Sequence, residues 1–199
     1  MRAYRRERLE NAIAYIIKIH QLLSKKEAAQ TYIYKYLALI DFRSIEETGK
    51  PVFDVDYDAF DKGPVPKNLY DYRDFIVDKE DEFDVIKLES NSEDNYIYKL
   101  KKEPNLDYLS DYEIELIEST VEEYANKSVV TKDLIEATHE KIKAWQVAWK
   151  NRGSKGRVPI NFLHTFDEIL DKDLDSLLPK EEVALVYNTL LSELKQRCV

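Results

Sequence analysis

Three aspartates at alternate positions are the first residues whose spacing could do chemistry. Asp54, Asp56 and Asp58 match the opening of a calcium-binding loop, in which alternating oxygens surround a hard cation. That loop also needs a glycine at its sharp turn and a bidentate glutamate at its end, whereas the sequence has Ala59 and Val65 there. We therefore favour a strand with a solvated acidic face over a calcium site.

A histidine and a glutamate form a second candidate. His139 and Glu140 match the start of a zinc-protease helix, but that site needs a second histidine where the sequence has Lys143. His20 and His164 are too distant in sequence to predict a cluster, so a core or capping role is favoured for the histidines. A metal-assisted hydrolase using His139, Glu140 and the three aspartates stays open as an alternative function.

Motifs for covalent catalysis are absent from the sequence. It contains no nucleophile elbow, no phosphate-binding glycine loop and no dinucleotide fingerprint. The one cysteine, Cys198, is next to the last residue of the chain and cannot form an intramolecular disulfide. We expect no catalytic residues, no metal and no cofactor, and hence a protein that is not an enzyme.

The charge balance restricts the kind of partner. The chain has 39 acidic and 30 basic residues and a formal net charge of −9. Affinity for phosphate backbones comes mainly from clustered Lys and Arg, so general nucleic-acid binding is disfavoured and a protein partner is favoured. The same balance leaves open a third function, an acidic, phage-borne mimic of nucleic acid.

The composition favours helices and a soluble, cytoplasmic protein. Glycine and proline number only 4 and 6 of 199 residues, which leaves little material for the tight turns of an all-β domain. The sequence has no apolar leader and no apolar run of about 18 residues, so we expect no membrane span.

Apolar residues at helical spacing predict several helices. The first covers residues 5–23, and a capping box formed by Ser24 and Glu27 is expected to open a second, which ends near Thr48 before Gly49. Further helices are predicted at 68–79, 110–126, 131–149 with Thr131 as its cap, 162–170 and 179–196. In the last of these, one face carries Val183, Val186, Tyr187, Leu190, Leu191 and Leu194.

Alternating residues predict a small amount of strand. Residues 52–60 alternate apolar side chains with aspartates, and the segment Gly63–Pro66 is expected to be a stiff turn. Residues 83–89 and 96–102 predict an antiparallel hairpin. The predicted fold class is α+β, predominantly helical: a single compact domain over residues 1–170 with a small antiparallel sheet, and a helical extension at 171–199 packed on it.

The order of two motifs resembles a known family. Lys35–Asp41 followed by Gly49–Val52 is similar to a Lys-Leu-Leu-Tyr-hydrophobic-Ala-Asp run and Gly-Arg-Pro-Ile, although Ala38 replaces a common tyrosine. Tyr57–Phe60 and then Gly63–Pro66 are similar to the Tyr-x-Ala-aromatic and Gly-Pro-Val-Pro blocks that follow. Over about residues 8–165 the chain resembles the SocA-like antitoxin family, or Panacea domain, which includes GepA-like prophage-associated proteins.

The resemblance implies an antitoxin that binds and neutralises a cognate toxin protein and that, in at least one branch of the family, acts as a proteolytic adaptor to a cellular protease. Tyrosine, with 14 occurrences, is common in interfaces. We therefore expect an acidic, tyrosine-bearing surface around residues 54–84 to face a basic or nucleotide-handling surface of the toxin. The candidate partner-binding residues are Tyr57, Phe60, Gly63, Pro64, Val65, Tyr70 and Tyr72. For the Gly63–Pro66 segment, a purely structural role is the favoured alternative.

Overall fold

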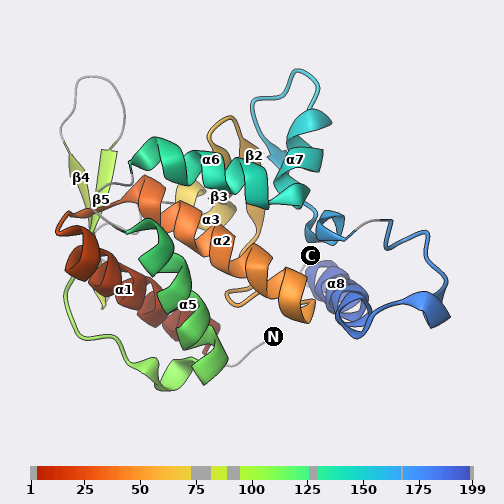
Figure 1. The fold of residues 1–199 in the computed structure, drawn as a ribbon, viewed down its shortest axis with the longest axis horizontal. Helices are drawn as coiled ribbons and strands as arrows, with labels where there is room; N and C mark the ends of the chain where they lie inside the picture. The colour runs from red at the N-terminus through yellow and green to blue at the C-terminus, as the bar shows by residue number, and fades with distance from the viewer. Residues whose placement is uncertain (1–3, 73–81, 89–94, 126–129, 167, 198–199) are drawn as a thin grey trace.

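The computed structural model describes residues 4–72, 82–88, 95–125, 130–166 and 168–197 (Figure 1). The helices are α1 (Arg5–Ser24), α2 (Gln30–Thr48), α3 (Lys67–Asp71), α5 (Asp111–Tyr124), α6 (Thr131–Lys141), α7 (Lys143–Lys150) and α8 (Pro179–Arg197). The strands are β1 (Ala28–Ala29), β2 (Tyr57–Phe60), β3 (Gly63–Pro66), β4 (Phe83–Leu88), β5 (Asn95–Leu100) and β6 (Val158–Pro159). The fold is predominantly helical α+β, which confirms the predicted class.

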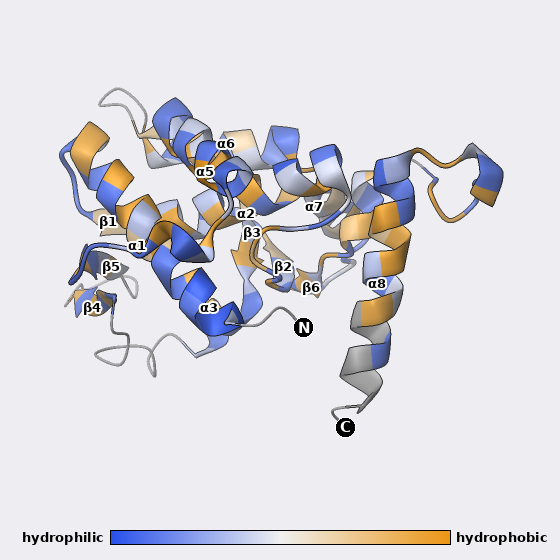
Figure 2. Cartoon of the chain, turned by 90° about the horizontal axis from the view of Figure 1, so that it is seen from below, coloured by the Kyte–Doolittle hydropathy of each residue, from blue (hydrophilic) through white to orange (hydrophobic). Residues whose placement is uncertain are grey.

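Two small antiparallel sheets lie under a layer of helices (Figure 2). The first has the order β1-β5-β4, and its β4–β5 pairing from Phe83↔Leu100 to Leu88↔Asn95 confirms the predicted hairpin. The second has the order β3-β2-β6 and joins residues 57–66 to Val158 and Pro159. This second sheet brings distant parts of the sequence together beside α3 and α7.

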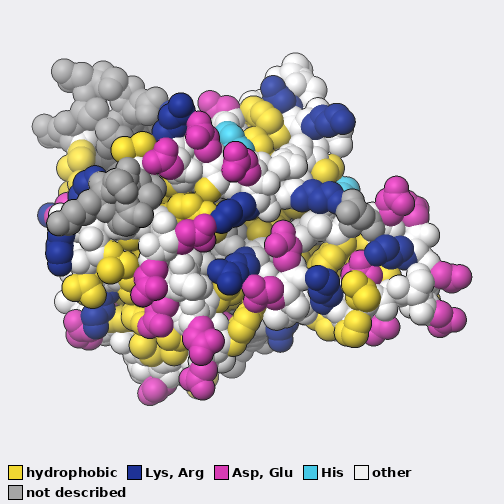
Figure 3. Space-filling model, viewed as in Figure 1, with side chains coloured by type: hydrophobic (Ala, Val, Ile, Leu, Met, Phe, Trp, Pro, Cys, Tyr) yellow, Lys and Arg dark blue, Asp and Glu magenta, His cyan; other side chains and the backbone are white. Residues whose placement is uncertain are grey.

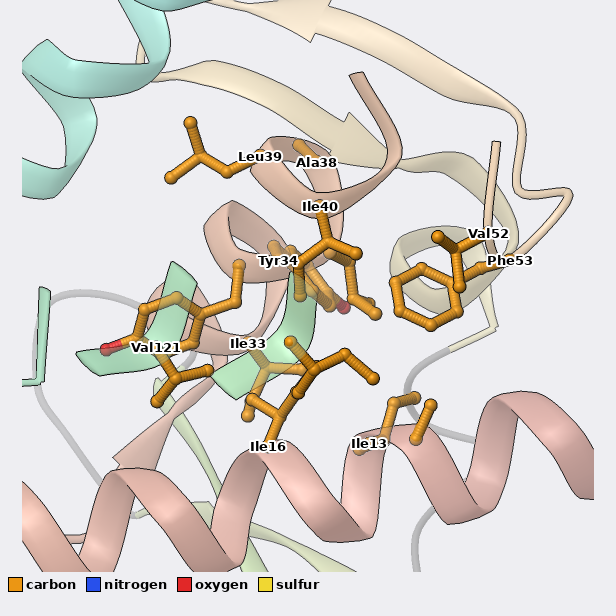
Figure 4. Packing of buried hydrophobic residues seen from close by; sticks show 14 of the residues in the cluster. Ile13, Ile16, Ile33, Tyr34, Ala38, Leu39, Ile40, Val52, Phe53 and Val121 are labelled. Atoms are coloured by element: carbon orange, nitrogen blue, oxygen red, sulfur yellow. The ribbon is translucent and has the colours of Figure 1, made fainter. Parts of the chain in front are cut away.

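Helix α2 is the centre of the core. Twelve of its residues are buried, on all sides of the helix, which is typical of a helix enclosed by other elements. Figure 4 shows Ile13 and Ile16 of α1 pointing towards Ile33 and Ile40 of α2, with Val121 of α5 close by. These side chains are 0–1% exposed, so they form the continuous interior on which the other elements rest.

Helix α5 is fixed at its start by side chains. The predicted capping box is present: the Ser110 hydroxyl accepts from the backbone N–H of Glu113, and the Glu113 carboxylate accepts from the N–H of Ser110 at 2.9 Å. Glu113 also pairs with Arg8 of α1. The start of α5 is therefore held against α1.

The start of α2 was predicted wrongly. Ser24 is the last residue of α1, where its hydroxyl donates to the carbonyl of His20 at 2.7 Å. Residues 28–29 form strand β1 against Tyr98 and Ile97, and α2 begins only at Gln30. The end of α2 was predicted correctly: Gly49 has φ +83°, and its N–H donates to the carbonyl of Ile45.

Other predicted segments differ in detail from the structure. Residues 131–149 form two helices instead of one, because Ile142 leaves the helical conformation at φ −103° and ψ 89°. The cap of α6 is Val130 and not Thr131. Among the described residues of the segment 162–170, only Phe162–Thr165 is helical, as a 3-10 turn. Helix α3 ends at Asp71, and the remainder of the predicted helix at 68–79 lies largely outside the described residues.

Helix α8 lies against the end of α2 (Figure 1). Ala184 of α8 is fully buried, and the Lys180 ammonium donates to the carbonyl of Glu46 at 2.8 Å. The division of the chain at residue 170 stays a prediction. Within the described residues, no helix has the length and apolarity needed to cross a membrane.

Candidate functional site

The Gly63–Pro66 segment is a strand and not a turn. All four residues are buried and pair with β2, and the chain reverses at Asp61 and Lys62 instead. Its prolines are tolerated because β3 is at the edge of its sheet, where not every N–H is needed for pairing. Of the predicted contact residues, Tyr57, Gly63, Pro64 and Val65 therefore face the interior.

Gly63 is required by its surroundings. Its φ is +95°, and a Cβ at this position would be 2.6 Å from the Thr138 hydroxyl and 3.1 Å from the Lys35 ammonium. Lys35, which is 2% exposed, donates to the carbonyl of Pro64 at 2.8 Å. Burial lowers the pKa of Lys35 to about 7, against an opposing effect of Asp61. Lys35 of α2 and Thr138 of α6 thus both contact the β2–β3 hairpin at its buried strand β3.

The predicted acidic strand face is only partly solvated. Asp54 has a left-handed backbone with φ 56° and accepts a hydrogen bond from Tyr187, so the strand begins only at Tyr57. Asp58 is 4% exposed and lies 3.6 Å from Arg157, while Asp56 is exposed. The expectation of a strand with a wet face was wrong, because β2 is the central strand between β3 and β6 and its residues Tyr57, Asp58 and Ala59 are buried.

The residues of the metal-hydrolase alternative are not brought together. Within the part of the chain that the structure describes, no group of three or more His, Cys, Asp and Glu side chains has the arrangement of a metal site. His139 instead stacks on Trp145, with ring centroids 4.1 Å apart and an interplanar angle of 2°. Burial and the nearby Lys35 lower the pKa of His139, so the ring is neutral at pH 7.

Trp145 connects α7 to the hairpin. Its indole N–H donates to the carbonyl of Phe60 at 3.1 Å, and its ring stacks on Trp149 at 5.9 Å and 14°. The Arg152 guanidinium lies over the Trp149 ring at 3.8 Å. The rings of His139, Trp145 and Trp149 and the guanidinium of Arg152 thus form one stack, in which Trp145 is buried and the other three groups are half-buried.

A second group of rings extends from the hairpin to α3. Phe60 packs against Tyr70 with centroids 5.1 Å apart, and Arg157 lies 6.0 Å from the Phe60 ring. Arg157 also donates to Asp71 at 2.7 Å. Tyr72 follows at the end of α3 and is 58% exposed. We call Phe60, Tyr70, Tyr72, Trp149, Arg152 and Arg157 the aromatic–arginine cluster.

Only half of this cluster was predicted from the sequence, namely Phe60, Tyr70 and Tyr72. Trp149, Arg152 and Arg157 were not predicted, and the pairing of β6 with β2 brings this part of the chain to the hairpin. One signal was available: residues 141–166 contain six basic residues and no acidic one, in a chain with 39 acidic residues. Figure 3 shows Lys and Arg side chains gathered over α7 and the loop after it.

The fold and this cluster define a helix-dominated α+β protein with a half-exposed surface of aromatic rings and arginines. The family model for the antitoxin SocA-like, Panacea domain matches residues 33–146, more than half of the chain. The chain therefore belongs to this family, which confirms the resemblance and supports a toxin–antitoxin role. No match was found among curated proteins or among solved structures.

Proposed function

We propose that this chain is an antitoxin that neutralises a cognate toxin protein by binding it directly through the aromatic–arginine cluster. Within this proposal the chain has no catalytic step of its own. Delivery of the bound toxin to a cellular protease is the alternative mode of neutralisation that the family resemblance implies. The observation that carries the proposal is the exposure of this cluster, which begins within the matched family domain at Phe60, Tyr70 and Tyr72 and continues just after its last residue, 146.

The composition of the cluster supports this location. Tryptophan, tyrosine and arginine are the residues that most often dominate binding energy in protein interfaces, since they offer large contact areas with few rotatable bonds. Two members are already fixed before a partner arrives: Trp149 stacks on Trp145, which is 6% exposed, and Phe60 contacts both Tyr70 and Arg157. Little conformational entropy is then lost on binding.

The charges around the cluster indicate the chemistry of the partner. Asp58 and Asp71 share one guanidinium, that of Arg157, which compensates one of their two negative charges. Lys150 and Lys155 are exposed, and no ion pair holds either of them within the described residues. We therefore propose an acidic toxin surface opposite α7. This differs from the basic surface expected opposite residues 54–84.

Growth rescue tests the proposal. The chain is co-expressed with the product of the gene adjacent to its own, and the Tyr70→Ala/Trp149→Ala variant is compared with Tyr112→Ala. Tyr112 is a matched control because it is 38% exposed and bonds to Glu47 on α2, on a different part of the surface.

We expect wild type and the Tyr112→Ala variant to restore growth equally, and the double variant to restore at least tenfold fewer colonies at equal soluble protein. Thermal unfolding of each purified variant confirms that it is folded. Full rescue by the double variant would reject the cluster as the binding site, and absence of rescue by the wild type would reject the adjacent gene product as its toxin.

A further inference from the structure

We propose that the exposed side of α8 is a second docking surface, which inserts into an apolar groove with a basic rim on the toxin. This inference rests on the proposed antitoxin function and adds a contact outside the matched domain, which ends at residue 146. It concerns Val183, Val186 and Leu190, which we call the α8 stripe.

The position of α8 on the protein is fixed by contacts with the end of α2, with Asp54 and with Phe162. Gly49 at the end of α2 approaches α8 so closely that a Cβ there would collide with the Lys180 carbonyl and lie 2.9 Å from the Cβ of Val183. Tyr187 donates to Asp54 and packs edge-on against Phe162 at 5.6 Å. The α8 stripe is therefore presented in a defined direction.

The α8 stripe is apolar and uncovered in this chain. Val183, Val186 and Leu190 are 40%, 60% and 53% exposed. Their spacing of three and four residues places them on one side of the helix. Leu170, Leu174 and Leu178, which precede α8, are 68%, 74% and 53% exposed. Figure 2 shows α8 extending away from the body of the molecule with hydrophobic residues along it, and Figure 3 shows hydrophobic side chains on the surface in the region of α8.

This pattern matches one mode of recognition. A helix that docks in a groove uses apolar anchors at positions i, i+3 and i+7, which is the spacing of Val183, Val186 and Leu190. Burial of such side chains is the main favourable contribution to docking. The sequence predicted a larger apolar face that includes these three residues, and it left open whether this helix completes the core or binds a partner. The structure buries the opposite side, at Glu181 and Ala184.

The charges at the ends of the α8 stripe favour a basic partner over a second copy of this chain. Glu182 precedes Val186 by four residues and Glu193 follows Leu190 by three, so an exposed carboxylate lies in line with the stripe at each end. Two copies packed stripe to stripe would bring carboxylates together in either the parallel or the antiparallel orientation. A groove with Lys or Arg at its rim meets the same carboxylates favourably.

Two separate contacts with one toxin would reinforce each other. The aromatic–arginine cluster and the α8 stripe belong to one rigidly connected body, since α8 packs on α2 and Trp145 on the hairpin. Once one surface is bound, the other meets the toxin at a high effective concentration. Loss of one of these two surfaces should therefore weaken the complex, while the remaining surface still binds the toxin.

The test measures the affinity of the full chain for the purified product of the adjacent gene by isothermal titration calorimetry. The variant is Val186→Ser/Leu190→Ser, and its control is Leu22→Ser/Leu88→Ser, which makes the same change at side chains that are 63% and 42% exposed elsewhere. We expect at least a tenfold weaker Kd for the α8 variant and an unchanged Kd for the control. Glu182→Gln/Glu193→Gln should lower the association rate and its salt dependence.

Each other outcome has a distinct meaning. An unchanged Kd for the α8 variant, together with a weakened Tyr70→Ala/Trp149→Ala variant, overturns the α8 proposal alone. Absence of binding by the wild type overturns both proposals. If light scattering finds that the free chain is a dimer and the α8 variant a monomer, the stripe is a contact between copies and the proposal is wrong. If the double variant does not fold, the single variant Leu190→Ser replaces it, and thermal unfolding shows whether each variant is folded.

Discussion

The Tyr57 hydroxyl donates a 2.8 Å hydrogen bond to the Asp41 carboxylate in the interior of the protein. The other oxygen of Asp41 accepts from the backbone N–H of Phe53 at 2.8 Å. Asp41 on α2 thus ties down the segment that leads from α2 into the β2–β3 hairpin. The two residues belong to the two motifs by which the sequence resembles its family, and the structure joins these motifs directly.

Replacement of Asp41 by asparagine should change how stability depends on pH. Burial raises the pKa of Asp41 from 3.8 to about 7, although its hydrogen bonds with Phe53 and Tyr57 oppose this effect. Between those values the native state holds a proton that unfolding releases, so this group's contribution to the free energy of unfolding falls as pH rises from about 4 to about 7. The wild type's stability relative to Asp41→Asn should decrease over that window and be constant above it. Urea unfolding from pH 4 to 8 measures this, and a pH-independent difference would contradict it.

The buried Lys35 should make the free energy of unfolding increase with pH, at higher pH than the decrease caused by Asp41. The Lys35 pKa of about 7 in the folded protein is below the ordinary value of 10.5, so between these values the unfolded state binds more protons. The free energy of unfolding should rise from pH 7 to pH 10 in the wild type, and this rise should be smaller in Lys35→Met. Lys67→Met, at an exposed site, is the control. Urea unfolding at several pH values measures this. If the free energy of unfolding rises equally with pH in wild type and Lys35→Met, the pKa of Lys35 is not lowered by burial.

Gly49 should be far less replaceable than Gly153. Both have positive φ, +83° and +62°, but a Cβ at Gly49 meets α8, whereas nothing lies within 4 Å of one at Gly153. Gly153→Ala should cost about 1 kcal/mol of stability through backbone strain alone. Gly49→Ala should cost at least about 2 kcal/mol more and should expose α8 to limited proteolysis. Equal melting temperatures for the two variants would show that α8 does not pack on Gly49.

The ion pair between Arg8 and Glu113 should stabilise the protein at neutral pH. Burial acts to raise the pKa of Glu113, but hydrogen bonds with Arg8 and Ser110 outweigh it, and the net pKa is lower than 4.5. This stabilisation is present above pH 4.5 and is lost as pH falls through the folded-state pKa. Glu113→Gln should therefore cost about 1.5 to 3 kcal/mol at pH 7 and less at pH 3. Chemical denaturation of wild type and Glu113→Gln at pH 7 and at pH 3 measures this cost, and a cost that is larger at pH 3 would contradict the prediction.

Local patterns predicted the elements that depend on neighbouring residues. The β4–β5 hairpin, the capping box of α5 and the glycine stop after α2 all follow from residues close in sequence. The two-residue strands β1 and β6 do not, because each exists only through pairing with a distant strand. Ser24 and Glu27 had the right spacing for a cap, but the chain uses residues 28–29 to pair with β5 before α2 begins.

The site was less predictable for the same reason. Phe60 and Tyr70 are close in sequence, but Trp149, Arg152 and Arg157 join them only through the β2–β6 pairing and the Trp145 hydrogen bond. The prolines of the Gly63–Pro66 segment favoured a stiff turn. They did not reveal that the segment is an edge strand buried over Lys35.

Calorimetric titration of the purified chain with the product of its adjacent gene tests most directly whether the folded surface binds a toxin. We predict a stoichiometric complex with the wild type, and a Kd at least tenfold higher for Tyr70→Ala/Trp149→Ala, whose unfolding temperature stays within a few degrees of the wild type. Wild-type affinity in that folded variant would contradict binding through the aromatic–arginine cluster, and neutralisation of the toxin without any complex would contradict direct binding altogether.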